Sequence, residues 1–170
     1  MKVKIRRIDK LLPLPEYKTK GAVGFDFMAR ISMTALPKGI VRVPLNIALK
    51  PPKGYFLLVA ARGSLPKKGL MLANSVGIGD EDFSGNNDEY WATLYNFTDR
   101  EVGIERGERL VQGIFKKYGK AEWEEVDDLG NRDRGGFGNL SCGGRRQRET
   151  TDTGVHKNLK RNRHAVRGGG

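Results

Sequence analysis

An alternation of apolar and polar side chains over residues 41–49 constrains this fold more than any other feature. The apolar residues take every second position, which is the period of a strand with one buried face. Five further segments have strand composition and end at Pro, Gly or Asp: Val3–Ile8, Tyr55–Ala60, Trp91–Phe97, Val102–Glu105 and Leu110–Tyr118. Only Lys67–Ala73 is expected to form a short helix. Many short strands without intervening helices predict an all-β sandwich or barrel.

The 170 residues are enough for one main domain, which we expect to span residues 1–144. Residues 145–170 carry eight Lys or Arg against Glu149 and Asp152, and few apolar residues. Such a segment buries too little surface to offset its ordering entropy, so we expect a disordered basic tail. Two roles stay open for it: it keeps the protein in solution, or it makes weak, salt-sensitive contact with nucleic acid.

Cysteine and histidine usage excludes several kinds of site. Cys142 is the single cysteine, and His156 and His164 lie in the basic tail, so a disulfide, a His/Cys zinc site in the domain and a Ser-His-Asp triad are excluded. Any general base must be a carboxylate, a lysine or a metal-held water. No run approaches the roughly 18 apolar residues of a membrane span, and no apolar signal segment follows Met1. We expect a cytoplasmic protein without membrane contact.

An acidic turn at Gly77–Gly85 carries two carboxylates, Asp80 and Asp82. It resembles a calcium-binding EF-hand loop, but the twelfth position is Trp91 where a bidentate Glu is required. The remaining chemistry is a carboxylate that holds a water and accepts its proton. A solvated acidic hairpin is the alternative.

Three other segments carry candidate site residues. Asp26 lies between two aromatic residues, and Arg62 opens a loop of unhindered amides and lysines at a possible helix start, which suits an anion. Late in the chain, Arg132–Gly138 offers a guanidinium, bare glycine backbone and the ring of Phe137, which suits a lid over a flat base. Taken singly, these segments could also be a turn carboxylate, a solvated basic turn and an unstructured tail.

The order of these segments resembles the trimeric dUTPase family. The matching segments are Gly24–Asp26, the Arg62 loop, Asn74–Gly85, Arg106–Gln112 and Arg132–Gly138, and the resemblance covers about residues 1–140. It implies a jelly-roll β-barrel that assembles as a homotrimer with active sites shared between subunits. The implied reaction is Mg²⁺-dependent hydrolysis of dUTP to dUMP and pyrophosphate by attack of water on the α-phosphate. This activity limits uracil incorporation into DNA and supplies dUMP.

The resemblance also implies residue roles. The catalytic residues would be Asp80, which deprotonates the water, Asp26, which supports the site and reaches Mg²⁺ through its hydration water, and Arg62, which binds phosphate. The Phe83 ring would pack under the deoxyribose and exclude a 2′-hydroxyl. The implied substrate-binding residues are Gly63, Ser64, Asn74, Gly77, Asp82, Phe83, Gln112, Arg132, Phe137 and Gly138.

The sequence departs from the family pattern at four places: Gly63 separates Arg62 from Ser64, Gly79 replaces an aliphatic residue, Asn86–Glu89 lengthen a hairpin, and Asn139 follows Gly138. We expect Gly79 to give a looser turn before Asp80. These departures leave a non-catalytic nucleotide- or partner-binding protein as an alternative. A dCTP deaminase is a further one, although it needs a Glu where Thr93 stands, three residues before Asn96.

Overall fold

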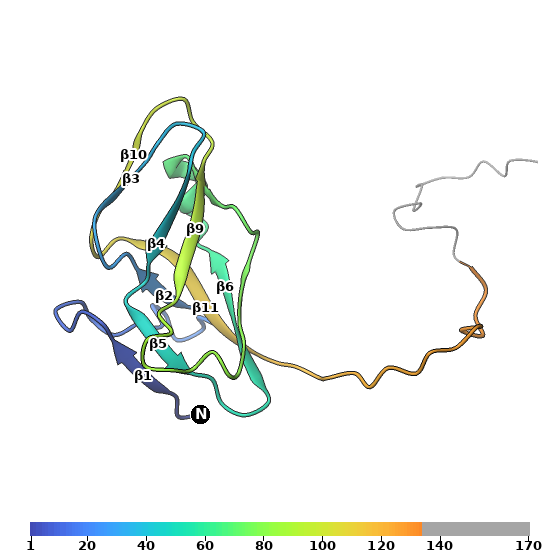
Figure 1. The fold of residues 1–170 in the computed structure, drawn as a ribbon. Coiled ribbons are helices and arrows are strands. Elements are labelled where there is room, and N and C mark those ends of the chain that lie inside the picture. Colours follow the sequence, from blue (N-terminus) through green and yellow to red (C-terminus); the bar gives the residue numbers. More distant parts are fainter. Residues whose placement is uncertain (134–170) are drawn as a thin grey trace, which may run out of the picture. The chain divides into compact units, whose positions relative to one another are not determined.

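The computed structural model describes residues 1–133, of which residues 1–123 form one compact unit (Figure 1). The predicted all-β class is confirmed. The described chain contains eleven strands and one short 3-10 helix, η1, while residues 124–133 contain neither helix nor strand. The elements are β1 (Lys4–Arg7), β2 (Phe25–Met28), β3 (Met33–Ala35), β4 (Ile40–Pro44), β5 (Ile47–Lys50), β6 (Tyr55–Ala61), η1 (Leu65–Lys68), β7 (Leu70–Leu72), β8 (Gly77–Gly79), β9 (Trp91–Asn96), β10 (Val102–Ile104) and β11 (Arg109–Lys117).

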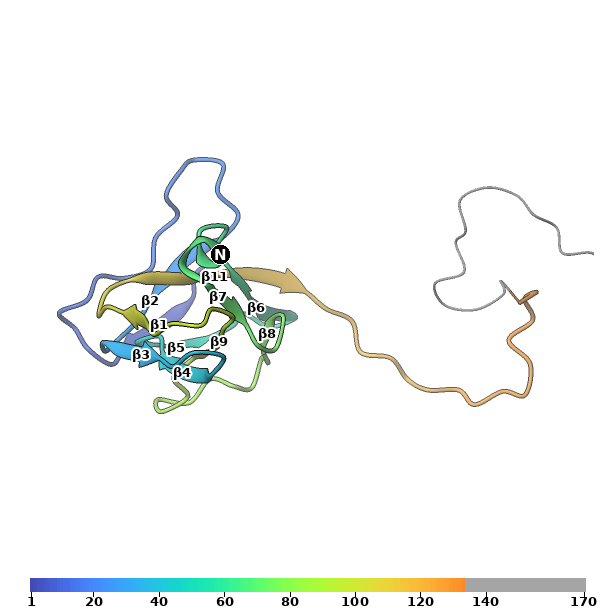
Figure 2. The same ribbon diagram turned by 90° about the horizontal axis from the view of Figure 1, so that it is seen from above.

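The strands form four antiparallel sheets. The largest has the order β2-β11-β6-β8, and a second has the order β4-β9-β7. The other two are the pairs β1-β5 and β3-β10. Figure 2 shows β2, β11 and β6 along one side of the unit and β3, β4, β5 and β9 along the other. Of the site residues predicted from sequence, Arg62 and Asp80 follow directly after β6 and β8, while Asp26 and Gln112 lie within β2 and β11.

A single apolar core fills the space between the layers. The first layer contributes Phe27, Leu57 and Val111, and the second contributes Val43 and Leu94, all with no exposed surface. Burial of such side chains is the main favourable term in folding, at roughly 1.5–3 kcal/mol each. The buried core thus provides rigid support for the loops at the ends of the strands.

One predicted strand is wrong, because residues 41–49 form two strands. The break falls at Asn46, which has a left-handed backbone (φ 68°) and lies between β4 and β5. Its side chain is buried and exchanges hydrogen bonds with the backbone of Asp9, at 2.6 Å and 3.0 Å. Residues 43–49 are buried without interruption, so the alternation of side chains does not correspond to one buried and one exposed face.

The helix predicted over Lys67–Ala73 is also wrong in its bounds. The 3-10 helix η1 starts earlier, with Pro66 in its first turn, and Gly69 ends it in a left-handed conformation (φ 88°). Residues Leu70–Leu72 then pair with β9 as a strand. The five other predicted strands are confirmed to within one residue at either end. Within residues 1–133, no helix has the length and apolar character needed to cross a membrane.

Candidate functional site

The loop after β6 is held in place by ion pairs to Asp26. The Arg62 Nε atom lies 2.9 Å from Asp26 Oδ1, and Arg62 donates a second bond to the Arg109 carbonyl at 3.0 Å. Arg109 itself donates to Asp26 Oδ2 at 3.2 Å. Asp26 is 8% exposed and has a guanidinium on each oxygen. In this subunit, Asp26 therefore acts first as the support that orients Arg62.

Gln112 ties the same loop to β11. It stands opposite Asp26 on one side and Ala60 on the other, and its Nε2 donates to the Ala61 carbonyl at 3.2 Å. A Cβ atom at Gly24 would lie 2.6 Å from Gln112 Oε1, so glycine at this position lets the Gln112 side chain keep its present place. The Gln112 amide thus braces the strand end from which the Arg62 loop departs.

A basic cavity of about 370 Å³ opens beside this loop. Arg62, Ser64, Arg109 and Lys68 line it, and Lys68 is ion-paired with Glu108. Nothing lies within 4 Å of the place where a Cβ would stand at Gly63, so the loop backbone is open to a ligand. Converging guanidinium groups and unhindered amides bind phosphate oxygens. The departure at Gly63 keeps this property.

The acidic turn forms a second cavity, of about 260 Å³, on the other side of β8. Its lining includes Asn74, Gly77, Asp80, Phe83 and Tyr90. Asn74 donates to the Val76 carbonyl at 3.0 Å, and 39% of the Phe83 surface is exposed. An exposed ring beside a carboxylate and an amide suits a flat, partly polar ligand. We call this cavity the nucleoside pocket, after the ligand that the sequence predicts for it.

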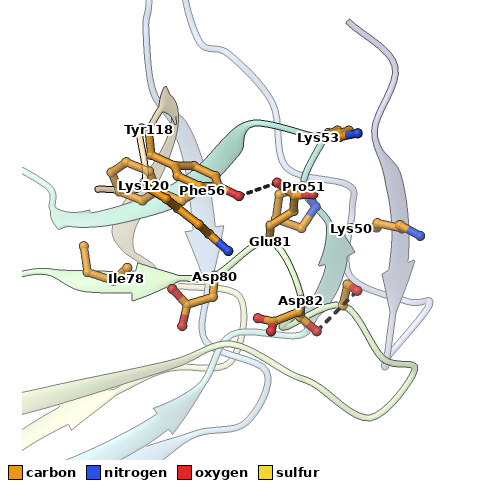
Figure 3. Close-up of a pocket in the computed structure, with 11 residues that line it drawn as sticks. Lys50, Pro51, Lys53, Phe56, Ile78, Asp80, Glu81, Asp82, Tyr118 and Lys120 are labelled. Carbon is orange, nitrogen blue, oxygen red and sulfur yellow. Dashed lines mark hydrogen bonds between the residues drawn. The ribbon is translucent and has the colours of Figure 1, made fainter. Parts of the chain in front are cut away.

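Asp80 and Asp82 also face a larger cavity of about 900 Å³ (Figure 3). Glu81, between them in sequence, lines the same cavity and accepts hydrogen bonds from Tyr118 Oη at 2.6 Å and from the Gly54 amide at 2.8 Å. The hydrogen bond from Tyr118, followed by that from Gly54, lowers the pKa of Glu81. Glu81 therefore anchors the turn, which leaves the two aspartates free to meet a ligand.

The expectation of a looser turn at Gly79 is wrong. Gly79 is a buried residue of β8, paired with Leu57, and its φ is not positive. A Cβ atom at this position would lie 2.5 Å from both Oη and Cε1 of Tyr90. The missing side chain is replaced by the Tyr90 ring, which packs against β8 just before Asp80.

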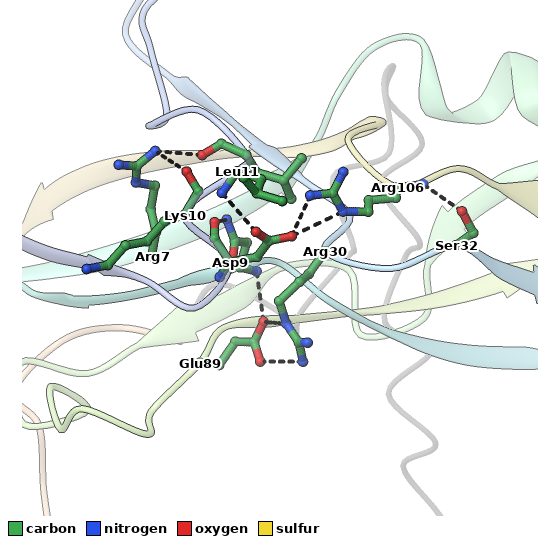
Figure 4. A network of polar contacts seen from close by, with 10 residues as sticks. Arg7, Asp9, Lys10, Leu11, Arg30, Ser32, Glu89 and Arg106 are labelled. Atoms are coloured by element: carbon green, nitrogen blue, oxygen red, sulfur yellow. Dashed lines mark hydrogen bonds and ion pairs between the residues drawn. The ribbon is translucent and has the colours of Figure 1, made fainter.

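The expectation of a hairpin at Asn86–Glu89 is wrong, because this segment joins β8 to β9, which belong to different sheets. The end of this loop is fixed by Glu89 (Figure 4). The Glu89 carboxylate accepts two bonds from Arg30, at 2.8 Å and 3.1 Å, and one from the Asn46 amide at 2.8 Å. Figure 4 also shows the neighbouring contact between Asp9 and Arg106, with Arg106 Nε donating at 3.1 Å. The added residues thus lead into β9 through a rigid clamp.

A metal ion held by protein side chains alone does not fit residues 1–133. That part of the chain has no group of three or more His, Cys, Asp or Glu placed to hold a metal. Mg²⁺ prefers six oxygen ligands and keeps several of its waters. Isolated carboxylates such as Asp80 and Asp82 fit a hydrated Mg²⁺ whose direct ligands come mainly from phosphate oxygens.

The predicted site residues fall into two separate sets. Of the three cavities described above, one contains the Arg62 loop and the other two contain residues of the acidic turn. Arg132 belongs to the second unit of the chain, so it is not placed relative to the cavities. Phe137 and Gly138 lie outside the described residues. The predicted residues of the Arg62 loop and of the acidic turn therefore line separate cavities; because a shared site was predicted, we call these cavities half-sites.

The sequence reasoning missed three residues that the structure adds to these half-sites. Arg109 carries an ion pair to Asp26, and its place in the Arg106–Gln112 segment was a signal for it. Lys68 lines the phosphate cavity from the end of η1, and its position in a basic loop was also visible. Nothing in the sequence indicated Tyr90, because its contact with Gly79 arises only when the chain is folded.

The chain matches the dUTPase family model over residues 11–143. It is 35% identical to the deoxyuridine 5'-triphosphate nucleotidohydrolase of Dictyoglomus turgidum over 148 residues, covering 84% of this chain and 99% of that protein. Identity to the Lactococcus lactis enzyme of the same name is 37%, covering 76% of this chain and 88% of that protein.

Solved structures give the same result. The dUTPase of Streptococcus mutans is 32% identical and superposes with a TM-score of 0.64, covering 70% of this chain and 98% of that one. The Staphylococcus bacteriophage 80alpha dUTPase with dUPNHPP shares the fold at 18% identity, with a TM-score of 0.70 over 81% of this chain and 96% of that one. The predicted jelly-roll type of β fold is thereby confirmed, and the chain belongs to the dUTPase family.

Proposed function

We propose that this protein hydrolyses dUTP to dUMP and pyrophosphate. The observation that carries the proposal is the pairing of a nucleoside pocket that contains Asp80 and Phe83 with a basic cavity organised by Arg62 and Asp26. These are the two recognition units that a nucleoside triphosphate requires, and family membership makes dUTP the substrate. The named relatives act on this nucleotide.

The nucleoside pocket would select the base and sugar. Asn74 and the neighbouring backbone read the uracil edge, and the Phe83 ring packs under the deoxyribose, where it leaves no room for a 2′-hydroxyl. Asp80 is exposed at this pocket and binds the attacking water by one oxygen, from which it takes a proton. Asp82 lies two residues further on the same turn and contributes to substrate binding.

The phosphate loop would hold the triphosphate chain. Arg62 binds phosphate oxygens, together with the amides of Gly63 and Ser64, while Gln112 keeps the loop in place. Arg132 clamps the terminal phosphate, and Phe137 stacks on uracil with Gly138 beside it. Positioning and charge neutralisation account for catalysis here, because no covalent intermediate is needed.

We propose Mg²⁺ as the cofactor, bound mainly by the substrate phosphates. When bound, it neutralises charge on the triphosphate. Asp26 would reach its hydration water, in competition with the ion pairs to Arg62 and Arg109. The dUTPase of S. aureus phage phi11 coordinates a structural Mg(II) ion. That relative supports a metal requirement here.

We also propose a homotrimer with shared sites. The separation of the two half-sites supports it, because a second copy can bring its phosphate cavity to the nucleoside pocket. An exposed apolar row is a second support. Ile40, Tyr95 and Met71 stand directly opposite one another across β4, β9 and β7, with Ile40 66% and Met71 46% exposed. Contact between copies would cover this row.

For the rest of the chain, the domain boundaries remain our proposal. Residues 1–144 form the dUTPase domain, and residues 132–138 form its closing arm. Residues 145–170, with their excess of Lys and Arg, provide weak contact with nucleic acid. Removal of residues 145–170 should leave dUTP turnover unchanged and reduce retention on a nucleic-acid column at low salt.

The deciding experiment is pyrophosphate release from dUTP, with dCTP, dTTP and UTP as controls, in Mg²⁺ and in EDTA. Selective release from dUTP that stops in EDTA is the expected result. Binding of an inert dUTP analogue without any release would instead identify a nucleotide-binding protein. Ammonia release from dCTP would identify a deaminase.

A further inference from the structure

Tyr90 connects the buried core to the nucleoside pocket. Its ring stacks on Phe27 with a centroid distance of 6.2 Å and an interplanar angle of 12°. It also meets Phe83 edge-on, at 5.2 Å and 79°. Phe27 has no exposed surface, whereas 39% of Phe83 is exposed. Tyr90 is thus the layer between the rigid core and the ring that would touch the sugar.

Gly79 makes this arrangement possible. Any side chain at residue 79 would collide with the Tyr90 ring, since a Cβ there would lie 2.5 Å from Cε1 and 2.8 Å from Cζ. Gly79 of β8 and Tyr90, the residue before β9, therefore form a complementary pair. The volume missing at Gly79, before Asp80, is filled by the Tyr90 ring.

The backbone of Tyr90 cannot retreat from the pocket. Its amide donates to the Ile47 carbonyl and its carbonyl accepts from the Leu45 amide, both at 2.9 Å. Its neighbour Glu89 is held by Arg30 and by the Asn46 amide. These contacts set the depth at which the ring stands under Phe83.

The ring, and not the hydroxyl group, carries the contact with Phe83. Among residues 1–133, Tyr90 Oη is the only buried side-chain polar atom without a hydrogen-bond partner. Burial, followed by the charges of Asp80 and Asp88, raises the pKa of Tyr90 to about 12. The phenol is therefore neutral at physiological pH, and its ring fills the space between Phe27 and Phe83.

From this packing, and resting on the proposed function, we infer that Tyr90 is a positioning residue that holds Phe83 against the sugar and thereby sets the preference for deoxyribose over ribose. When Tyr90 holds the Phe83 ring in place, no room remains for a 2′-hydroxyl. When the Phe83 ring can tilt into the space left by Tyr90, a 2′-hydroxyl fits. The discrimination thus depends on a residue that acts through Phe83.

The test compares kcat/KM for dUTP and UTP in two variants. Tyr90→Leu removes the ring, and the dUTP-to-UTP ratio of kcat/KM should fall about tenfold or more, the scale set by a change of one or two carbon atoms in a pocket. Tyr90→Phe is the matched variant, because it keeps the ring and removes only the hydroxyl. Its ratio should equal that of the wild type.

Two further variants separate positioning from general stability. Gly79→Ala leaves Tyr90 in the sequence but pushes its ring, so the ratio should also fall; it decides the matter if Tyr90→Leu does not fold. Ile104→Ala removes a core side chain of β10 outside both cavities, and should lower the melting temperature without changing the ratio.

The outcomes distinguish this inference from the proposed function. An active wild type whose ratio is unchanged in both Tyr90→Leu and Gly79→Ala would overturn the inference alone. An equal fall in Tyr90→Phe would assign the role to the hydroxyl and also overturn it. A wild type that does not hydrolyse dUTP would overturn the proposed function and, with it, the inference.

Discussion

Two aspartates of the candidate site differ in what surrounds them. Asp26 is buried between Arg62 and Arg109, while Asp80 is exposed at the rim of the nucleoside pocket. An exposed carboxylate can bind a water and take its proton. A carboxylate with a guanidinium on each oxygen is better suited to orient those groups. The two residues should therefore respond differently to the same Asp-to-Asn change.

Asp80→Asn should lower turnover of dUTP by about 10²–10⁴-fold, because the amide can bind the water but cannot accept its proton. Binding of an inert dUTP analogue should be retained. Single-turnover kinetics and calorimetric titration measure the two quantities. Asp99→Asn, a change at an exposed residue paired with Lys38, is the control and should leave turnover unchanged. Near-normal turnover in Asp80→Asn would remove Asp80 from the proton transfer.

Asp26→Asn should destabilise the fold by about 1–3 kcal/mol, since it leaves two partly buried guanidinium groups without a counter-charge. The expected destabilisation is kept small because solvent screens the two arginines, whose side chains are 26% and 38% exposed. Urea denaturation followed by fluorescence measures the change. If the denaturation midpoint stayed at the wild-type value, the ion pairs would not contribute to stability.

At the residue scale, the sequence predicted the chemistry better than the packing. Asp80, Phe83 and Asn74 lie around one pocket, as their shared segment implied. The Tyr90–Gly79 contact could not be predicted, because it depends on which strand residues face each other in the core. A glycine in a motif therefore indicated a loose turn, although the space is filled.

Among the elements, the turn after β8 is the one on which the site depends most. Glu81 accepts hydrogen bonds from the Gly54 amide, in the turn between β5 and β6, and from Tyr118, just after β11. Both bonds stabilise the charged carboxylate, which is why the folded-state pKa lies below the ordinary value of 4.5. A group with a lowered pKa contributes stability above its unfolded pKa, and this contribution is lost as the pH falls through the folded value.

Glu81→Gln should therefore be less stable than the wild type near neutral pH, and the difference should vanish as the pH falls below about 4.5. Melting temperatures of both proteins between about pH 3 and pH 8 provide the measurement, because this range includes the titration of carboxylates. Glu101→Gln is the control, because Glu101 is exposed and should show no such convergence. A difference that persisted unchanged in acid would mean that the Glu81 charge is not involved.

Element prediction succeeded where local sequence decides and failed where distant contacts do. Five predicted strands correspond to β1, β6, β9, β10 and β11, whereas the short strands β2, β3 and β8 were not predicted. The prediction for segment 41–49 was wrong, because the buried side chain of Asn46 pairs with Asp9 and turns the chain between two ladders. Leu70–Leu72 were assigned to a helix because no local signal shows that β9 accepts them as a strand.

For the whole molecule, the central question is where the two half-sites meet. If sites form between copies, a chain that lacks Asp80 function can supply a working phosphate loop to a chain that lacks Arg62. Motif order predicted the family fold and, through the family resemblance alone, a homotrimer. The residues that pair between copies could not be predicted, since these surfaces are set by the folded shape.

Mixing Asp80→Asn with Arg62→Ala after joint unfolding and refolding should restore part of the wild-type turnover, because mixed assemblies contain intact sites. Each variant refolded alone is the control and should stay inactive. Light scattering should give a mass of three chains of 18.9 kDa. A monomer, or the absence of any recovery in a confirmed mixed assembly, would contradict shared sites.

The clamp formed by Arg30, Glu89 and the Asn46 amide holds one end of the loop that joins β8 to β9. Glu89 directly precedes Tyr90, so the clamp also fixes the backbone that carries the Tyr90 ring. The other end of the loop leads to Phe83 and has no such ion-pair clamp within residues 1–133. A foreign peptide, such as an affinity tag, inserted at residues 86–88 should therefore disturb Phe83 before it disturbs Tyr90.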